Sequence, residues 1–181
     1  MSILNKNRSG FTLIELMVVI AIIGIALAIA IPNILAWLPN VRLKTAARDL
    51  YSNIQKAKVE AVKRNVCVSI VFTPVVYPAT GGSYVGFFDD GSGGGTACNG
   101  SQDGTEAVLF PTTAMPQSIS LVSANNIGGL NAVCLNPKGL VCGSQSGSIT
   151  MRNNQSRWYR VQVQAAGGMQ TQMSGDGVTW N

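Results

Sequence analysis

The apolar residues of this chain are concentrated near its N-terminus. From Leu16 to Ile31 every residue is apolar or glycine, and after Pro32 and Asn33 the apolar pattern resumes as ILAWL. A run approaching about 20 such residues is long enough to cross a lipid bilayer as a helix. The pattern therefore predicts a hydrophobic helix over residues 11–38 that is able to span a membrane.

A second helical pattern occupies residues 39–65, where apolar residues spaced alternately by four and three form one stripe. The stripe consists of Leu43, Ala47, Leu50, Ile54, Ala57 and Ala61. Cations outnumber acids between the stripe residues, so the opposite face is basic. We expect the stripe to pack on a sheet and the basic face to be solvated. Contact of this face with anionic lipid or nucleic acid is the alternative.

Two prolines lie where the two helical patterns meet. Pro32 and Pro39 each lack an amide hydrogen and disfavour helix at the preceding residue. One long helix from Phe11 to Asn65 is therefore expected to bend or to melt locally, with the kink at Pro32. Such a helix is longer than the core of a small domain needs, so its first half is expected to pack against lipid or other helices.

After Asn65 the helical period gives way to strand-like alternation. In VCVSIVF, residues 66, 68, 70 and 72 are expected on one face of a strand and residues 67, 69 and 71 on the other. Further short strands are expected between Gly, Pro, Asn and Ser clusters. They lie around Tyr84 to Phe88, Ala107 to Phe110, Ile119 to Ser123, Ala132 to Leu135, Ser148 to Arg152, Trp158 to Gln164 and Met169 to Met173. The predicted fold class is α+β, with a mostly antiparallel β head over residues 66–181 laid on the helix.

Length and charge add little to this picture, since 181 residues suggest one domain and the net charge is only +5. Two of the cations, Lys6 and Arg8, precede the apolar run, as in a secretory signal peptide. The small-residue stretches ALA and AIA could then serve as cleavage sites, leaving a free head that starts near Pro32. The length of the run and the acid within it argue against this alternative.

That acid is Glu15, near the start of the apolar run. A carboxylate at the centre of a membrane helix costs roughly 2.5 to 3.5 kcal/mol. One explanation is that Glu15 reaches back to the lipid headgroups. The other is that cleavage after Gly10 removes residues 1–10 and leaves a new amine on Phe11. The Glu15 carboxylate of one helix could pair with this amine on a neighbouring copy and set the axial register of a filament.

The sequence GFTLIELMVVIAIIG, followed by AIAIPN, resembles the leader region of type IV pilins and type II secretion pseudopilins. The resemblance implies that a prepilin peptidase cuts after Gly10 and methylates Phe11, and that Glu15 serves assembly. It implies other pilin subunits and an inner-membrane assembly platform as partners. It also implies a single-pass protein of the bacterial inner membrane, with its head in the periplasm, that enters a pilus or pseudopilus after processing.

The later sequences KAKVEAVKRNVCVSIVF, YVGFFDDG and RWYRVQVQAAGGMQ resemble the GspH/FimT branch of that superfamily. This resemblance implies a minor pseudopilin near the tip of a type II secretion pseudopilus, which supports protein secretion across the outer membrane. The alternative is a FimT-like minor type IV pilin that primes pilus assembly or binds DNA for natural transformation.

The four cysteines, Cys67, Cys98, Cys134 and Cys142, all lie outside the apolar run, and an even number fits an oxidising compartment. CLNPKGLVC can fold back on itself, which favours a Cys134–Cys142 bond and leaves Cys67 to pair with Cys98. Buried free thiols are the alternative. A zinc site is not expected, because the chain has no histidine and no C-x-x-C pair.

We expect neither an enzyme nor a cofactor. Without histidine the chain has no Ser-His or Cys-His pair, and its acids form no obvious pair on one element. In FFDDGSGGGTACNGSQDG, the oxygens of Asp89, Asp90, Asn99 and Asp103 lack the order of a known calcium loop, so a flexible solvated loop is expected. Its glycines do not form a phosphate-binding loop either.

One candidate nucleic-acid patch remains, where cations and aromatics alternate at Arg152, Arg157, Trp158, Tyr159 and Arg160. DNA binding by FimT-type pilins is linked to a basic C-terminal tail. This chain ends MSGDGVTWN, with no Lys or Arg after Arg160. An ordinary strand with solvated arginines is therefore the favoured interpretation.

Overall fold

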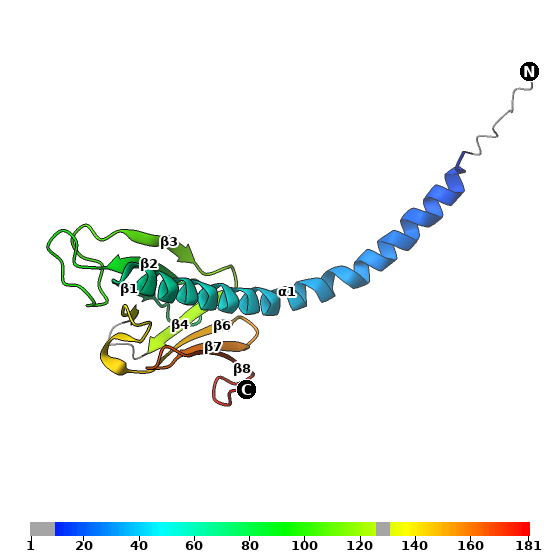
Figure 1. Cartoon of the computed structure of the whole chain (residues 1–181). Coiled ribbons are helices and arrows are strands. Elements are labelled where there is room, and N and C mark those ends of the chain that lie inside the picture. Colours follow the sequence, from blue (N-terminus) through cyan, green and yellow to red (C-terminus); the bar gives the residue numbers. More distant parts are fainter. Residues whose placement is uncertain (1–9, 126–130) are drawn as a thin grey trace, which may run out of the picture. The chain divides into compact units, whose positions relative to one another are not determined.

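The computed structural model describes residues 10–125 and 131–181. The chain forms two compact units that divide between Leu38 and Pro39. One helix, α1 (Leu13–Arg64), belongs to both units, and the strands all belong to the second. Figure 1 shows the helix and the strands in chain order. The finer division into residues 1–10, 11–38, 39–65 and 66–181 stays a prediction.

Local hydrogen bonds fix both ends of α1. The amide of Glu15 donates to Thr12 Oγ1 at 3.3 Å, so Thr12 caps the first turn. At the other end, Asn65 has a left-handed backbone with φ of 56°. The amide of Val66 then donates to the carbonyl of Ala61 at 3.2 Å, which is the hydrogen bond of a Schellman cap. These caps explain why the helix begins at Leu13 and ends at Arg64.

Neither Pro32 nor Pro39 interrupts α1, which is assigned as one continuous helix. Of the two expected outcomes, bending or local melting, local melting is therefore wrong. A helix tolerates the loss of one amide donor when the turns on either side keep theirs. Pro39 is also buried. A kink at Pro32 stays a prediction.

The described strands form two antiparallel sheets of four strands each, with orders β3-β2-β1-β5 and β4-β6-β7-β8. The first sheet contains β1 (Cys67–Thr73), β2 (Ser83–Asp89), β3 (Val108–Ala114) and β5 (Ala132–Leu135). The second contains β4 (Ile119–Asn125), β6 (Gly147–Asn153), β7 (Trp158–Val163) and β8 (Met169–Ser174). A short 3₁₀ turn, η1 (Cys142–Ser144), follows β5. Each strand expected from the sequence is present, which confirms the α+β fold class.

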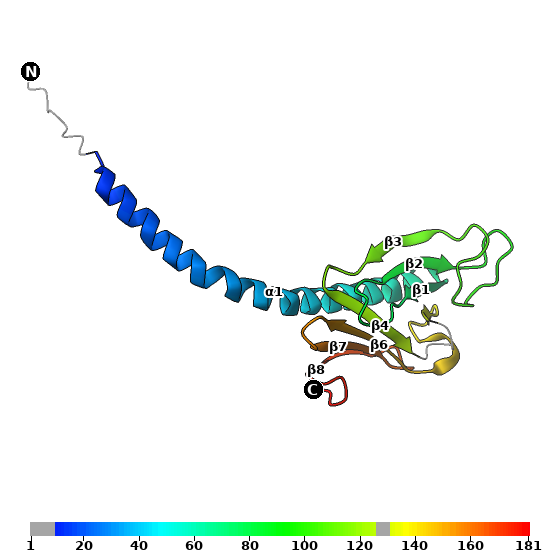
Figure 2. The ribbon, with the colours of Figure 1, turned by 180° about the vertical axis from the view of Figure 1, so that it is seen from behind.

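The second half of α1 runs alongside strands of both sheets (Figure 2), and buried residues of all three form one core cluster. All six residues of the predicted apolar stripe are buried, which confirms that this face packs inward. Leu50 and Ile54 are fully buried in one cluster with Ile70 of β1 and Ile149 of β6. A hydrogen bond of 2.9 Å from Asn53 Nδ2 to Tyr84 Oη adds a polar link from α1 to β2. The helix therefore holds the two sheets together.

The strand β1 is buried on both faces, which the alternating pattern does not predict. Ile70 and Phe72 lie in the core as expected. On the other face, Cys67 and Ser69 are also buried, at 2% and 0% exposure. They are covered by residues 89–106, because Cys67 is bonded to Cys98 and Ser69 Oγ donates to Asp89. The segment after β2 is thus a second layer on this sheet.

Two loops of the head, at Gly139 and Gly167, come close to each other and to Lys58 of α1. Lys58 Nζ donates to the carbonyl of Gly167 at 2.9 Å, and a Cβ on Gly167 would collide with the carbonyl of Gly139. Gly167 also has a left-handed φ of 72°. Gly143 has a similar φ of 75° but has no atom near the position of a Cβ.

We expect Gly167→Ala to lower the free energy of unfolding by about 1–3 kcal/mol, because it adds a backbone collision to the strain of a positive φ. Gly143→Ala is the matched control, since it adds the positive-φ strain alone. The measurement is urea unfolding of the full chain in detergent micelles. Equal losses in the two variants would contradict the close approach at Gly167.

Candidate functional site

The candidate processing and assembly residues lie together at the start of α1. Gly10 and Phe11 precede the helix and are exposed, and Glu15 occupies its first turn. A carboxylate in the first turn interacts favourably with the positive end of the helix dipole. Thr12 and Glu15 also have the T-x-x-E spacing of a capping box, which is a local signal in the sequence for the start of this helix. Glu15 thus has a local role in the helix besides any role in assembly.

The first half of α1 exposes apolar side chains all around the helix. Phe11 is 82% exposed, and the residues from Leu13 to Trp37 are exposed as well. Within the described residues, α1 is the one helix long and apolar enough to cross a membrane. Gly24 has no side chain, so a neighbouring helix could approach closely at this position. A surface of this kind needs lipid or other helices to cover it.

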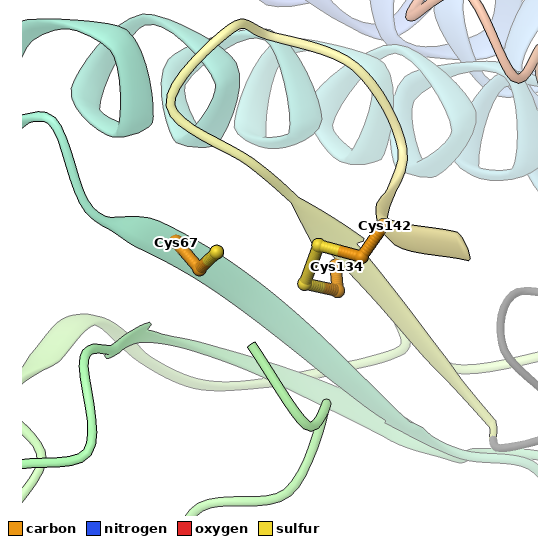
Figure 3. A group of neighbouring side chains, drawn as sticks. All are labelled: Cys67, Cys134 and Cys142. Carbon is orange, nitrogen blue, oxygen red and sulfur yellow. A yellow bond between two sulfur atoms is a disulfide. The ribbon is translucent and has the colours of Figure 1, made fainter. Parts of the chain in front are cut away.

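The four cysteines form two disulfides on the outer face of the first sheet, Cys67–Cys98 and Cys134–Cys142. These are the pairs that the sequence favours. The chain between Cys134 and Cys142 does fold back, because the amide of Asn136 donates to the carbonyl of Leu140 at 2.9 Å. The Sγ atoms of Cys67, Cys134 and Cys142 lie within 4.8 Å of one another (Figure 3).

Buried carboxylates organise the segment between β2 and β3. Asp89 is fully buried and accepts from Ser69 Oγ at 2.6 Å and from the amide of Gly100 at 2.8 Å. Glu106 is 5% exposed and accepts from the amides of Gly91 and Asp103. The carboxylate oxygens of Asp89 and Glu106 thus accept hydrogen bonds from protein donors, and they do not converge on one position as calcium ligands would. The expectation of a flexible solvated loop is wrong for Asp89, because its carboxylate is buried and hydrogen-bonded.

The residues of the candidate nucleic-acid patch lie on β6, on β7 and in the turn between them. The Arg152 guanidinium lies 3.7 Å from the centroid of the Tyr77 ring and 4.8 Å from that of Trp158. Arg160 lies 4.3 Å from the Trp180 ring centroid, and both its Nε and Nη2 donate to Gln172 Oε1. Three ring faces are thus already covered by arginines of the same chain. A base that stacked there would have to displace these contacts.

These arginines lack carboxylate partners among the residues that the structure describes. The salt bridges there join Glu60 to Lys63 and Arg64, and none involves Arg152, Arg157 or Arg160. The Arg157 side chain is exposed. The cluster therefore keeps a net positive charge that an anionic partner can meet.

The last residues of the chain form a loop organised by Asp176. Its carboxylate accepts from Ser174 Oγ at 2.7 Å, from the amides of Val178 and Thr179, each at 2.9 Å, and from Thr179 Oγ1. The hydrogen bond from Ser174 is the largest of the contributions that hold the pKa of Asp176 far below its ordinary value. The loop also brings Asn181 back to pair with Met173 of β8. Trp180 is thereby placed over Arg160.

We expect Asp176→Ala to release this loop without unfolding the head, so that the indole signal of Trp180 in an NMR spectrum moves toward its random-coil position. Because the folded pKa is lowered, the carboxylate stabilises the loop fully above its unfolded pKa of about 3.9. This contribution is lost as the pH falls from there toward the folded value, so the wild type should release the loop only in that acidic range. Asp90→Ala, a change at another exposed acid, is the control. An unchanged Trp180 signal in Asp176→Ala would contradict this role.

Comparison with known proteins gives two family-level matches. The family described as "Type II transport protein GspH" matches residues 46–167, and the "Prokaryotic N-terminal methylation motif" matches residues 5–31. The first match runs from the amphipathic half of α1 to the turn after β7, and the second contains Gly10, Phe11 and Glu15. Strand β8 and the C-terminal loop lie beyond both matches.

Individual relatives are similar over shorter stretches. Pilin-like protein PilA1 of Thermus thermophilus is 36% identical over 84 residues, which is 46% of this chain and 49% of that protein. Type IV major pilin protein PilA of Myxococcus xanthus is 50% identical over 46 residues, 25% of this chain and 21% of that protein. The chain thus spans about half or less of the length of these relatives. The crystal structure of the Pseudomonas aeruginosa type IV minor pilin FimU aligns over 72% of this chain and 88% of that one, with 14% identity and a TM-score of 0.46.

Proposed function

Because this chain belongs to the type II transport protein GspH family, within the type IV pilin and pseudopilin superfamily, we propose that it is a minor pseudopilin of a type II secretion system. In this role it is a structural subunit near the tip of a periplasmic pseudopilus and supports protein secretion across the outer membrane. The observation that carries the proposal is the GspH match, which covers the amphipathic half of α1 and most of the head.

The exposed apolar half of α1 is covered first by lipid and later by the helices of other subunits. In the inner membrane, lipid covers the helix surface, which is apolar all around. In the filament, matching helices of neighbouring subunits replace the lipid, and small residues such as Gly24 let them approach. Cleavage after Gly10 and methylation of Phe11 by a prepilin peptidase precede this transfer, which an inner-membrane assembly platform carries out.

Glu15 provides the register of the assembled helices in this proposal. Its carboxylate faces the amine of Phe11 on the neighbouring subunit, so that each charge offsets the burial of the other. The first turn of α1 begins only two residues after Phe11, so amine and carboxylate both lie at the same helix end. An axial shift of one subunit would leave both charges unpaired in an apolar filament core.

A gene deletion tests whether the subunit belongs to a type II secretion system or to a type IV pilus. In a bacterium that carries the gene, we expect the deletion to trap folded secretory proteins in the periplasm while type IV pili remain on the surface. The wild-type gene supplied on a plasmid should restore secretion. Normal secretion together with lost pili or lost DNA uptake would contradict the proposal and support a FimT-like minor type IV pilin.

The observation that favours this alternative is the positive charge of Arg152, Arg157 and Arg160, which have no carboxylate partner among the described residues. A DNA-binding role predicts that the full chain in detergent micelles binds fluorescent DNA with an affinity that falls steeply as salt increases. Replacing the three arginines by alanine should then remove binding, while Arg48→Ala on the exposed face of α1 should not. For a secretion pseudopilin we expect no salt-dependent binding in this assay.

A further inference from the structure

The two disulfides of the head lie side by side on one face of the first sheet. Cys134 of β5 pairs directly with Ser69 of β1, and Cys67 lies two residues before Ser69 on the same strand face. The two cysteines therefore project to the same side of the sheet. Figure 3 shows Cys67 beside the Cys134–Cys142 bond. The Sγ atoms of the three cysteines all lie within 4.8 Å of one another.

The two cysteines of the first disulfide differ in exposure. Cys67 is 2% exposed, whereas Cys98 belongs to an exposed part of the segment between β2 and β3. An external thiolate therefore reaches the Cys67–Cys98 bond at Cys98. Its attack forms a mixed disulfide on Cys98 and releases Cys67 as a thiolate. That thiolate is produced within 4.8 Å of both sulfurs of the Cys134–Cys142 disulfide.

We propose that Cys67 is an internal nucleophile that couples the two disulfides. Once released, the Cys67 thiolate attacks Sγ of Cys142, a Cys67–Cys142 bond forms, the Cys134–Cys142 bond breaks, and Cys134 leaves as the thiolate. Cys142 is the sulfur that changes partner because it lies in the short turn η1, whereas the ladder hydrogen bonds hold Cys134 on β5. Cys98 is thus a site for reversible modification by an external thiol or dithiol.

Hydrogen bonds keep the modified loop close to its starting position. The amides of Asn99 and Gly100 donate to the Asp89 carboxylate, and the amide of Cys98 donates to the Asp89 carbonyl at 3.1 Å. These bonds do not involve the disulfide, so they survive its opening. Cys98 therefore stays near β1, and the exchange can run back to the starting pairs when the external thiol leaves.

Two matched variants test the proposal in the full chain, purified in detergent micelles. Cys98→Ser leaves Cys67 free beside the second disulfide, and Cys67→Ser leaves Cys98 free instead. Each protein is held near pH 8.5, about the pKa of an ordinary thiol, and then labelled with a maleimide and mapped by peptide mass spectrometry. We expect the label in Cys98→Ser to appear on Cys134 as well as Cys67, with a Cys67–Cys142 bond, and the label in Cys67→Ser to appear on Cys98 alone.

Label confined to Cys67 in the folded Cys98→Ser variant would overturn the proposal. If either variant fails to fold, the wild type provides the same test after limited reduction with dithiothreitol, which supplies the two electrons and becomes the cyclic disulfide. Species that have lost one disulfide should then carry label on Cys98 and Cys134. Label found only on the original pairs, Cys67 with Cys98 or Cys134 with Cys142, would contradict the coupling.

Discussion

Glu15→Ala should leave membrane insertion and cleavage after Gly10 intact but reduce incorporation into the filament by about two orders of magnitude. This is the effect of removing one partner of a buried charge pair, because the Phe11 amine of the neighbouring subunit then stays buried without a counter-charge. The measurement compares the amount of the variant in sheared filaments with the amount in membranes. Incorporation equal to that of the wild type would contradict the charge-pair role of Glu15.

Two further variants separate this role from the local role of Glu15 in the helix. Glu15→Gln keeps a side chain that can complete the capping box but removes the charge. Thr12→Ala removes the side-chain oxygen that caps the first turn and keeps the carboxylate. The charge-pair proposal predicts that Glu15→Gln is nearly as defective as Glu15→Ala, and that Thr12→Ala assembles. The opposite ranking would mean that capping, not charge, is what assembly requires.

The second large effect is expected at Leu50, whose side chain is fully buried where α1 meets both sheets. Leu50→Ala should lower the free energy of unfolding by about 2–5 kcal/mol, because it removes buried methyl groups and leaves a cavity. Domains of this kind have only about 5–15 kcal/mol of stability in total. The measurement is urea unfolding of the full chain in detergent micelles, followed by circular dichroism.

Val59→Ala is the matched control for Leu50→Ala. Val59 lies on the same helix and is 60% exposed, so its truncation should change the free energy of unfolding by no more than about 0.5 kcal/mol. Similar losses at the two positions would mean that α1 does not hold the head together as described.

The helix and the strands of this chain could be predicted from the sequence because their signals are local. The stripe from Leu43 to Ala61 repeats with the helical period, and each strand is bounded by turn residues. The ends of α1 differ from the predicted ends by one or two residues, since they depend on a cap at Thr12 and a left-handed Asn65. The capping pattern at Thr12 and Glu15 was present in the sequence as a further local signal.

The environment of the segment between β2 and β3 could not be predicted in the same way. Asp89 and Glu106 look like surface acids in a glycine-rich loop, yet both are buried. Their partners include Ser69, which lies 20 residues away along the chain, and amides whose direction is fixed only once the loop has closed. The stacking of Trp180 on Arg160 likewise depends on the C-terminal loop, which the sequence pattern of β7 does not reveal.

The most direct test of the proposed processing and assembly is the N-terminal sequence and intact mass of the protein purified from membranes of a cell that expresses it. We expect a chain that starts at Phe11 with a methylated amine and keeps the whole apolar half of α1. A chain that starts near Pro32 would contradict it, because the apolar run would then be an export signal and no assembly helix would remain.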